Sequence, residues 1–221
     1  MTKKKALKKS DTKHVLVLRT CSKGMTSYGD FRWPTSGVVE AKDWNPNKVC
    51  GYGLHGLLWG EGDGSLLDWD TDAKWLVVSV PEGTTVDLDG KVKFPRGEVV
   101  FCGDRKGATE YLQARSPGRN IVGATATAGY AGTATAGYAG TATAGVRGTA
   151  TAGYAGTAIA GYAGTATAGD AGILNLRWWD GKRYRIATFY VGEDGIEPNQ
   201  PYKVDEKGRP VKVEKKAVSN D

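Results

Sequence analysis

Two side chains in the first sixty residues are well suited to bind an anion. Arg19 ends a predicted buried strand, where its guanidinium could meet a phosphate or a carboxylate. His55 lies in a Gly-rich segment, and glycines let the backbone approach a ligand closely. We therefore predict a pocket for a nucleotide or a host protein. Its candidate residues are Arg19, His55, Gly51 and Gly53.

The same region offers little for catalysis. No carboxylate is placed by the sequence to act as a base, since Glu98 is the single late glutamate in a strand context. We therefore expect binding without turnover, with no catalytic residue, no cofactor and no metal. Gly51, Gly53 and Gly56 match Gly-x-Gly-x-x-Gly, but a turn at 45–48 precedes them where a dinucleotide site needs a strand.

The cysteines indicate free thiols. Cys21, Cys50 and Cys102 are odd in number and widely spaced, so neither a disulfide framework nor a zinc site is expected. Free thiols fit a reducing compartment, and we expect a cytoplasmic protein.

The order of elements around these residues resembles two groups of proteins. The segments 18–20, 53–55 and 75–80 are similar to ADP-ribosyltransferase-like domains, which implies that Arg19 and His55 line a nucleotide pocket. The sequence departs from that family because it has no His-Tyr-Glu or Arg-Ser-Glu set. The segments 18–21 and 53–56 also resemble an uncharacterised domain of phage and prophage proteins, which implies no particular chemistry.

These residues need a sheet to position them, and the first 120 residues predict one. Apolar runs indicate strands, Asp89-Gly90 indicates a hairpin turn, and Asp104 is suited to cap a helix that ends near Arg115. The predicted strands are 14–19, 75–80, 86–88, 92–94 and 98–102. We therefore expect an α+β domain over residues 14–120.

The middle of the chain is a repeat array. From Thr125 to Gly172, one octapeptide, Thr-Ala-Thr-Ala-Gly-Tyr-Ala-Gly, occurs six times with few substitutions and no insertion. Thr and Ala alternate with the period of a strand, and Gly-Tyr-Ala-Gly predicts a turn. Eight residues cannot enclose a core, so two octapeptides must form one coil. The array predicts a parallel β-solenoid of about three coils within residues 121–176.

Alanine is expected inside the solenoid and threonine outside. A coil of two short strands has room for little more than methyl groups, and the alanine positions become Leu174 and Leu176 where the array ends. The outward threonines would lie about 6.6 Å apart along a strand and about 4.8 Å apart between coils. The predicted surface residues are Thr125, Thr127, Thr133, Thr135, Thr141 and Thr143.

The octapeptide resembles the repeats of bacterial ice-nucleation proteins, which read Ala-Gly-Tyr-Gly-Ser-Thr-x-Thr. The corresponding string here is Ala128-Gly129-Tyr130-Ala131-Gly132-Thr133-Ala134-Thr135. The resemblance implies outward Thr-x-Thr rows that bind ice, and a ladder of tyrosines. The chain departs from that family in the shortness of the array and in having alanine at core positions that are polar there.

The tyrosines at the turns predict self-association. Alternate octapeptides share a side, so Tyr130 and Tyr162 should lie on one edge of the coils and Tyr138 and Tyr154 on the other. Aromatic rings exposed along a neutral rod can bury a large area between two copies. We therefore expect a homo-oligomer.

After the array, residues 177–221 predict a β cap followed by a tail. Asp180-Gly181 is a hairpin turn signal between two apolar strands. Trp178 and Trp179 directly follow the last coil, so we expect them to cover the alanine core.

Charge is concentrated at the amino terminus. The net charge is +6, of which +5 lies in residues 1–13, a predicted disordered basic tail. Nucleic acid is expected to bind only weakly, through this tail. No apolar run approaches membrane-spanning length, so no membrane partner is expected.

Together these features predict a mostly β protein: an α+β amino-terminal domain, a short parallel β-solenoid with two octapeptides per coil, and a β-hairpin carboxy-terminal cap. The first functional hypothesis is a non-enzymatic, phage- or prophage-type binding or scaffold protein that self-associates through its solenoid. The alternatives are an ADP-ribosyltransferase-like enzyme and an ice-binding, ice-nucleation-like protein.

Overall fold

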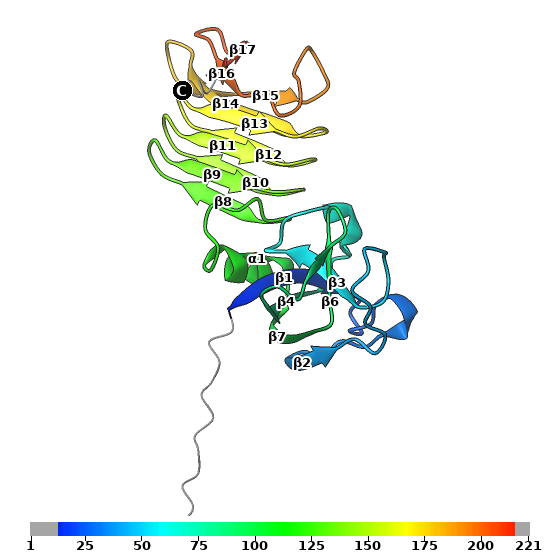
Figure 1. The fold of residues 1–221 in the computed structure, drawn as a ribbon. Coiled ribbons are helices and arrows are strands. Elements are labelled where there is room, and N and C mark those ends of the chain that lie inside the picture. Colours follow the sequence, from blue (N-terminus) through cyan, green and yellow to red (C-terminus); the bar gives the residue numbers. More distant parts are fainter. Residues whose placement is uncertain (1–12, 215–221) are drawn as a thin grey trace, which may run out of the picture.

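A computed structural model describes residues 13–214, so most of the predicted basic tail and the last seven residues lie outside the described part. The described chain forms a head with one antiparallel sheet, then a solenoid, then four strands at the far end (Figure 1). The predicted fold class is therefore confirmed.

The head contains a seven-stranded sheet in which all neighbours pair antiparallel. In sheet order, the strands are β2 (Gly37–Glu40), β7 (Arg96–Gly103), β4 (Lys74–Pro81), β1 (His14–Cys21), β3 (Leu54–Leu58), β6 (Val92–Phe94) and β5 (Val86–Asp87). The predicted strands and the hairpin about Asp89-Gly90 are confirmed. Because β1 lies next to β3, the sheet brings the segments that carry Arg19 and His55 side by side.

Both faces of this sheet are buried, as the alternation along β1 requires. Leu16 and Leu18 point to the face covered by α1 (Arg105–Gln113), where they pack in one cluster with Leu112. Val17 points to the opposite face and packs near Trp33. The Asp104 side chain accepts a hydrogen bond from the Gly107 amide at 2.8 Å, which confirms the predicted cap of the helix.

The six octapeptides form six strands, which pair in parallel with the strand two octapeptides away. One sheet contains β8 (Thr125–Ala128), β10 (Thr141–Ala144) and β12 (Thr157–Ala160). The other contains β9 (Thr133–Ala136), β11 (Thr149–Ala152) and β13 (Thr165–Ala168). Two octapeptides therefore make one coil, and the array makes three coils, as the repeat length predicts.

The core of the solenoid consists of alanine methyl groups. Ala142, Ala150, Ala158 and Ala166 are fully buried, and the threonines between them remain partly exposed. A buried methyl group contributes only about 0.8 kcal/mol, so this core depends on its backbone ladders and on the structures at both ends.

Glycine is required in the repeat where the backbones of neighbouring coils approach each other closely. Alanine instead occupies the strained position of each turn. In each Gly-Tyr-Ala-Gly turn the alanine, or Arg147 in the third repeat, has a positive φ; Ala155 is at +50°. This left-handed conformation costs a residue with a Cβ about 1–2 kcal/mol. By contrast, a Cβ at Gly153 would lie 2.7 Å from the carbonyl carbon of Gly137, one coil below. Stacking at one strand spacing leaves no room there for a side chain.

The far end of the solenoid is closed by larger apolar side chains. β14 (Ile173–Trp179) continues the first solenoid sheet and pairs antiparallel with β15 (Tyr184–Tyr190). β16 (Tyr202–Val204) pairs with β13, and β17 (Pro210–Lys212) pairs with β16. The residues that cover the alanine core are Leu174, Leu176, Val191, Ile196 and Tyr202.

The predicted tryptophan lid is wrong. Trp178 packs against Gly208, where an added Cβ would lie 2.6 Å from the indole ring. Trp179 is 44% exposed and packs edge-on against Tyr184. Trp178 shares the inward face of β14 with Leu174 and Leu176, but β12 pairs with β14 only as far as Leu176, so Trp178 lies beyond the edge of the coil, and alternation turns Trp179 to the other face.

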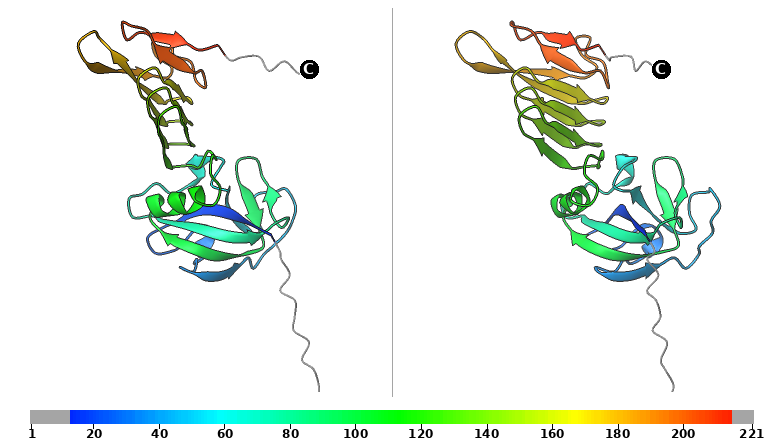
Figure 2. Two further views of the ribbon diagram at one scale, coloured as in Figure 1. Left: turned by 90° about the vertical axis from the view of Figure 1, so that its left-hand side faces the viewer. Right: turned by 60° about the vertical axis from the view of Figure 1, so that its left-hand side comes forward.

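The head and the solenoid share a packed junction (Figure 2). Ile121 and Ala124 belong to the same apolar cluster as Leu112 of α1. Tyr138 packs against Trp69 of the head, with ring centroids 5.7 Å apart and the ring planes tilted by 33°. The first coil is therefore built onto the head without a flexible linker.

Two substitutions in one turn separate these roles of glycine and alanine. Gly153→Ala should lower the free energy of unfolding by about 1–3 kcal/mol or more, because the new methyl group overlaps the coil below. Ala155→Gly should leave stability within about 1 kcal/mol of the wild type or raise it, because relief of the left-handed strain offsets the entropy lost at glycine. Thermal and urea unfolding of both variants measures this, and an equal loss in the two would contradict the assignment.

Candidate functional site

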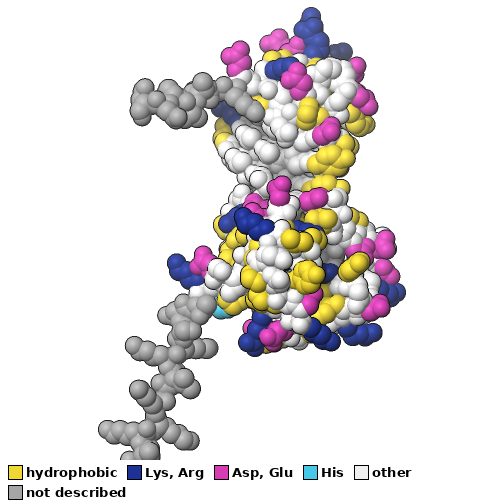
Figure 3. Space-filling view, turned by 45° about the vertical axis from the view of Figure 1, so that its right-hand side comes forward, with side chains coloured by type: hydrophobic (Ala, Val, Ile, Leu, Met, Phe, Trp, Pro, Cys, Tyr) yellow, Lys and Arg dark blue, Asp and Glu magenta, His cyan; other side chains and the backbone are white. Residues whose placement is uncertain are grey.

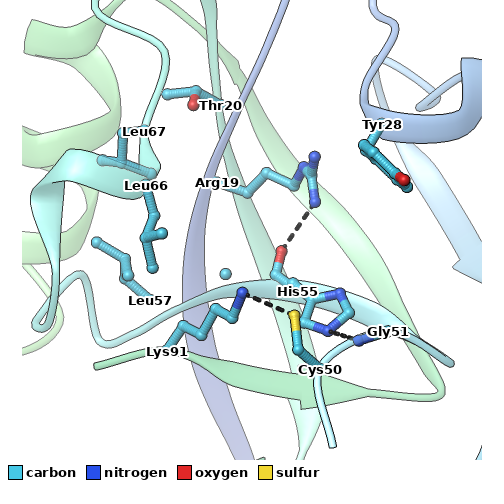
Figure 4. A pocket seen from close by; sticks show the side chains of 11 residues that line it. Arg19, Thr20, Tyr28, Cys50, Gly51, His55, Leu57, Leu66, Leu67 and Lys91 are labelled. Carbon is cyan, nitrogen blue, oxygen red and sulfur yellow. Dashed lines mark hydrogen bonds between the residues drawn. The ribbon is translucent and has the colours of Figure 1, made fainter. Parts of the chain in front are cut away.

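The head contains a cavity of about 520 Å³ beside β1 and β3, and it has a cationic lining. Figure 4 shows Leu57, Leu66 and Leu67 on one side of Arg19 and Tyr28 on the other. The lining includes Arg19 and Lys91 but no aspartate or glutamate. The full set is Arg19, Thr20, Tyr28, Cys50, Gly51, His55, Gly56, Leu57, Leu66, Leu67 and Lys91.

Arg19 is held by its neighbours from two sides. Its Nη1 donates a hydrogen bond to the His55 carbonyl oxygen at 3.1 Å, and its guanidinium carbon lies 4.5 Å from the centroid of the Trp33 ring. Burial lowers the pKa of Arg19, and the neighbouring Cys21 partly offsets this. An arginine remains charged at neutral pH in this situation. The head therefore presents a fixed positive charge to the cavity.

His55 is uncharged at neutral pH. Burial first, and then the positive charges of Lys91, Arg19 and Lys93, lower the pKa of His55 from 6.5 to about 4. Its Nε2 accepts a hydrogen bond from the Gly51 amide at 3.3 Å. The histidine therefore orders the Gly-rich loop and does not add a cation to the pocket.

Lys91 faces the exposed thiol of Cys50. The Lys91 ammonium donates a hydrogen bond to Cys50 Sγ at 3.1 Å, and this contact lowers the pKa of the Cys50 thiol. Lys93, which is completely buried, holds the same loop through Asn47 Oδ1 and the Val49 carbonyl, both at 2.8 Å. Both lysines come from the hairpin of β5 and β6, so this hairpin fixes the rim of the pocket.

The structure brings together three of the four residues predicted from sequence. Arg19, Gly51 and His55 line the cavity, but Gly53 does not. Gly53 has a φ of +148°, and a Cβ there would lie 2.9 Å from the Trp44 ring, so its role is structural. Glu98 lies on β7, two strands away from β1, and is not in the lining.

Sequence reasoning missed Lys91 and the apolar wall. Lys91 directly follows the Asp89-Gly90 turn, which is the one signal that a hairpin tip lies there. Nothing local connects that tip with Cys50, 41 residues earlier.

The solenoid carries a second candidate site. Six threonines on β9, β11 and β13 stand in register between coils, and we name them the threonine face: Thr133, Thr135, Thr149, Thr151, Thr165 and Thr167. No charged residue belongs to this face, and the solenoid as a whole has far fewer charges than the head and the cap (Figure 3).

The opposite sheet is less regular. Its outward residues are Thr125, Thr127, Thr141, Thr143, Thr157 and Ile159. Ile159 interrupts the rows, and a cavity of about 430 Å³ separates this face from Arg185 and Ile186 of the terminal hairpin. The threonine face is therefore the more regular of the two.

The tyrosines lie along the two edges of the coils. Tyr138 and Tyr154 stack with ring centroids 5.3 Å apart, and they extend the column that begins at Trp69. On the other edge, Tyr130 is 69% exposed, and Tyr162 packs against Tyr184 of the terminal hairpin.

Two further properties of the described residues bear on function. Within residues 13–214, no group of three or more His, Cys, Asp or Glu side chains is placed to bind a metal ion. None of the helices in this part of the chain is both long and apolar enough to cross a membrane.

Comparison with known proteins adds a relationship for the head. Residues 15–114 match a family model described as a domain of unknown function, DUF7666. Over about 100 residues, the chain is also similar to bacterial ice nucleation proteins. No solved structure matches the chain significantly. The resemblance suggested by the octapeptides is therefore accompanied by a significant similarity to ice nucleation proteins.

The matched relatives are much longer than this chain. The ice nucleation protein InaU of Pantoea ananas is 42% identical over 100 residues, which is 44% of this chain and 10% of InaU. An ice nucleation protein of Pseudomonas fluorescens is 45% identical over 100 residues, 44% of this chain and 8% of its own length. That of Xanthomonas campestris pv. translucens is 42% identical over 105 residues, 47% of this chain and 7% of its own length. The chain therefore spans a tenth or less of these relatives.

The contact between Lys91 and Cys50 predicts selective thiol reactivity. At pH 7, iodoacetamide should modify Cys50 faster than Cys21 or Cys102, because the pKa of Cys50 is lowered while burial raises the other two. Lys91→Met should slow the modification of Cys50, and Lys23→Met, an exposed control, should not. Peptide mass spectrometry follows each site, and equal rates at the three cysteines would contradict the prediction.

The lowered pKa of His55 predicts an acid-sensitive fold. Between pH 6.5 and about 4, the unfolded chain binds a proton at this histidine that the folded protein does not, so the free energy of unfolding falls as the pH falls. His55→Gln should flatten this dependence, and His14→Gln, at the exposed start of β1, should leave it unchanged. Urea unfolding across this pH range measures both. Identical slopes in the two variants would exclude His55 as the source.

Proposed function

We propose that this protein binds ice through the threonine face of its solenoid. The observation that carries the proposal is the register of the three threonine pairs, which repeat at the strand spacing with no charged or bulky residue between them. The similarity of the chain to ice nucleation proteins over about 100 residues supports it.

The chemistry of the face suits an ordered layer of water. Each threonine presents one hydroxyl and one methyl group, and its β-branched side chain has little freedom about χ1. The hydroxyls can hydrogen-bond to water, while the methyl groups limit competing contacts with disordered solvent. Because the coils repeat about every 4.8 Å, the hydroxyls form a lattice that a crystal surface of water can match.

The size of the face favours binding over nucleation by a single chain. A face of three coils is much smaller than an ice embryo that is stable a few degrees below freezing. A single copy therefore binds ice that already exists. Nucleation requires several aligned copies, for which the tyrosine edges offer aromatic surface.

The test compares one position on each face. Thr151→Lys places a long charged side chain in the centre of the threonine face, and Thr143→Lys places it at the equivalent position of the other sheet. In slow ice growth, the wild type and Thr143→Lys should be incorporated into the ice, and Thr151→Lys should remain in the liquid. Unfolding temperature and circular dichroism check that both variants are folded. Exclusion of the wild type from ice, or no difference between the variants, would refute the proposal.

A further inference from the structure

We infer that the cavity of the head is a binding site for a small organic anion of the nucleoside monophosphate class, with its phosphate at Arg19 and its base against the leucine wall. This site is separate from the threonine face, and the inference does not depend on ice binding.

Arg19 has a donor that no group of the described residues satisfies. Arg19 Nε is buried, and it is the one buried side-chain polar atom in residues 13–214 without a hydrogen-bond partner. A buried donor without an acceptor lowers the stability of the fold by about 1–3 kcal/mol, and by more when the donor is charged. An anion in the cavity would supply the acceptor that the protein does not.

Within the described residues, no carboxylate lines the cavity to balance the charge of Arg19. Cys21 interacts with the guanidinium, and burial raises the pKa of its thiol, so it stays a neutral thiol and a weak acceptor. Asp68 lies near this group but is not in the lining, and its Oδ1 accepts a hydrogen bond from the Asp70 amide. The charge of Arg19 is therefore available to a ligand.

The lining of the cavity carries positive charge only. Lys91 adds a further cation at the rim, so the site favours a ligand with more than one negative charge. A phosphate monoester carries a charge of about −1.5 to −2 at pH 7 and can accept a bidentate hydrogen bond from a guanidinium.

The remaining surface of the cavity is mainly apolar and aromatic. Leu57, Leu66 and Leu67 form an apolar wall, and Leu66 is 50% exposed. Tyr28 is fully exposed on the opposite side. A planar base would cover these groups and could stack on the tyrosine ring. The volume of about 520 Å³ lies in the usual range for small-molecule sites.

The test is calorimetric titration of the whole protein with the four nucleoside 5′-monophosphates, each measured separately at pH 7.5. At least one should bind with a Kd of about 0.1 mM or tighter. Inorganic phosphate and the matching nucleoside should each bind at least about tenfold more weakly, because each lacks half of the contacts. Absence of binding by all four nucleotides at about 5 mM would overturn the inference.

Two variants locate the site. Arg19→Gln should weaken binding at least about tenfold, and Arg96→Gln, an exposed control on β7, should not change it. Because the buried arginine could affect folding, Leu66→Asp provides a second variant at an exposed position, where a carboxylate would replace the apolar contact with the base. Binding that survives Leu66→Asp would also overturn the assignment.

A third readout requires no substitution. The bound nucleotide should slow alkylation of Cys50 at the rim and leave Cys102 unaffected. Thr151→Lys should retain nucleotide binding, and Leu66→Asp should retain incorporation into ice. Failure of one proposal is therefore distinguishable from failure of the other.

Discussion

The stacking of coils at one strand spacing is the constraint on which the solenoid depends. Parallel pairing fixes the distance between coils, and at the turns this distance brings backbone against backbone. Only glycine fits at Gly153 and its equivalents, because a Cβ would overlap the coil below. The repeat accepts left-handed alanine in the same turn, which shows that steric clearance between coils outweighs local strain there.

This constraint also makes the solenoid dependent on its neighbours. A core of alanine methyl groups stabilises the fold weakly, so both ends must be closed by larger apolar surfaces. At one end, Tyr138 packs onto Trp69 and against Gly64 of the head. At the other, Leu174, Leu176 and Tyr202 fill the space above the last coil. The same rigid stacking holds the threonines in register, so stability and the candidate ice-binding surface have one physical origin.

The head is stabilised by a larger apolar core than the solenoid. Its sheet buries both faces, and the cavity occurs where β1 and β3 meet the loop that Lys93 holds. Buried cations there are satisfied mainly by carbonyl oxygens and aromatic rings, with no carboxylate in the lining. Such an arrangement leaves net positive charge facing the cavity, which is a property of a binding site more than of a structural core.

The sequence by itself determined the solenoid and most elements of the head. The octapeptide period, the alanine core and the Asp-Gly hairpins are local patterns, and a local pattern fixes which way a strand residue points. Only the tertiary structure decided the rim of the pocket and the positions of the tryptophans. Lys91 reaches Cys50 only because the hairpin folds onto a loop 41 residues away. Gly53 and Trp178 serve packing because Trp44 and Gly208 lie against them. These contacts join distant segments, so no spacing within the chain encodes them.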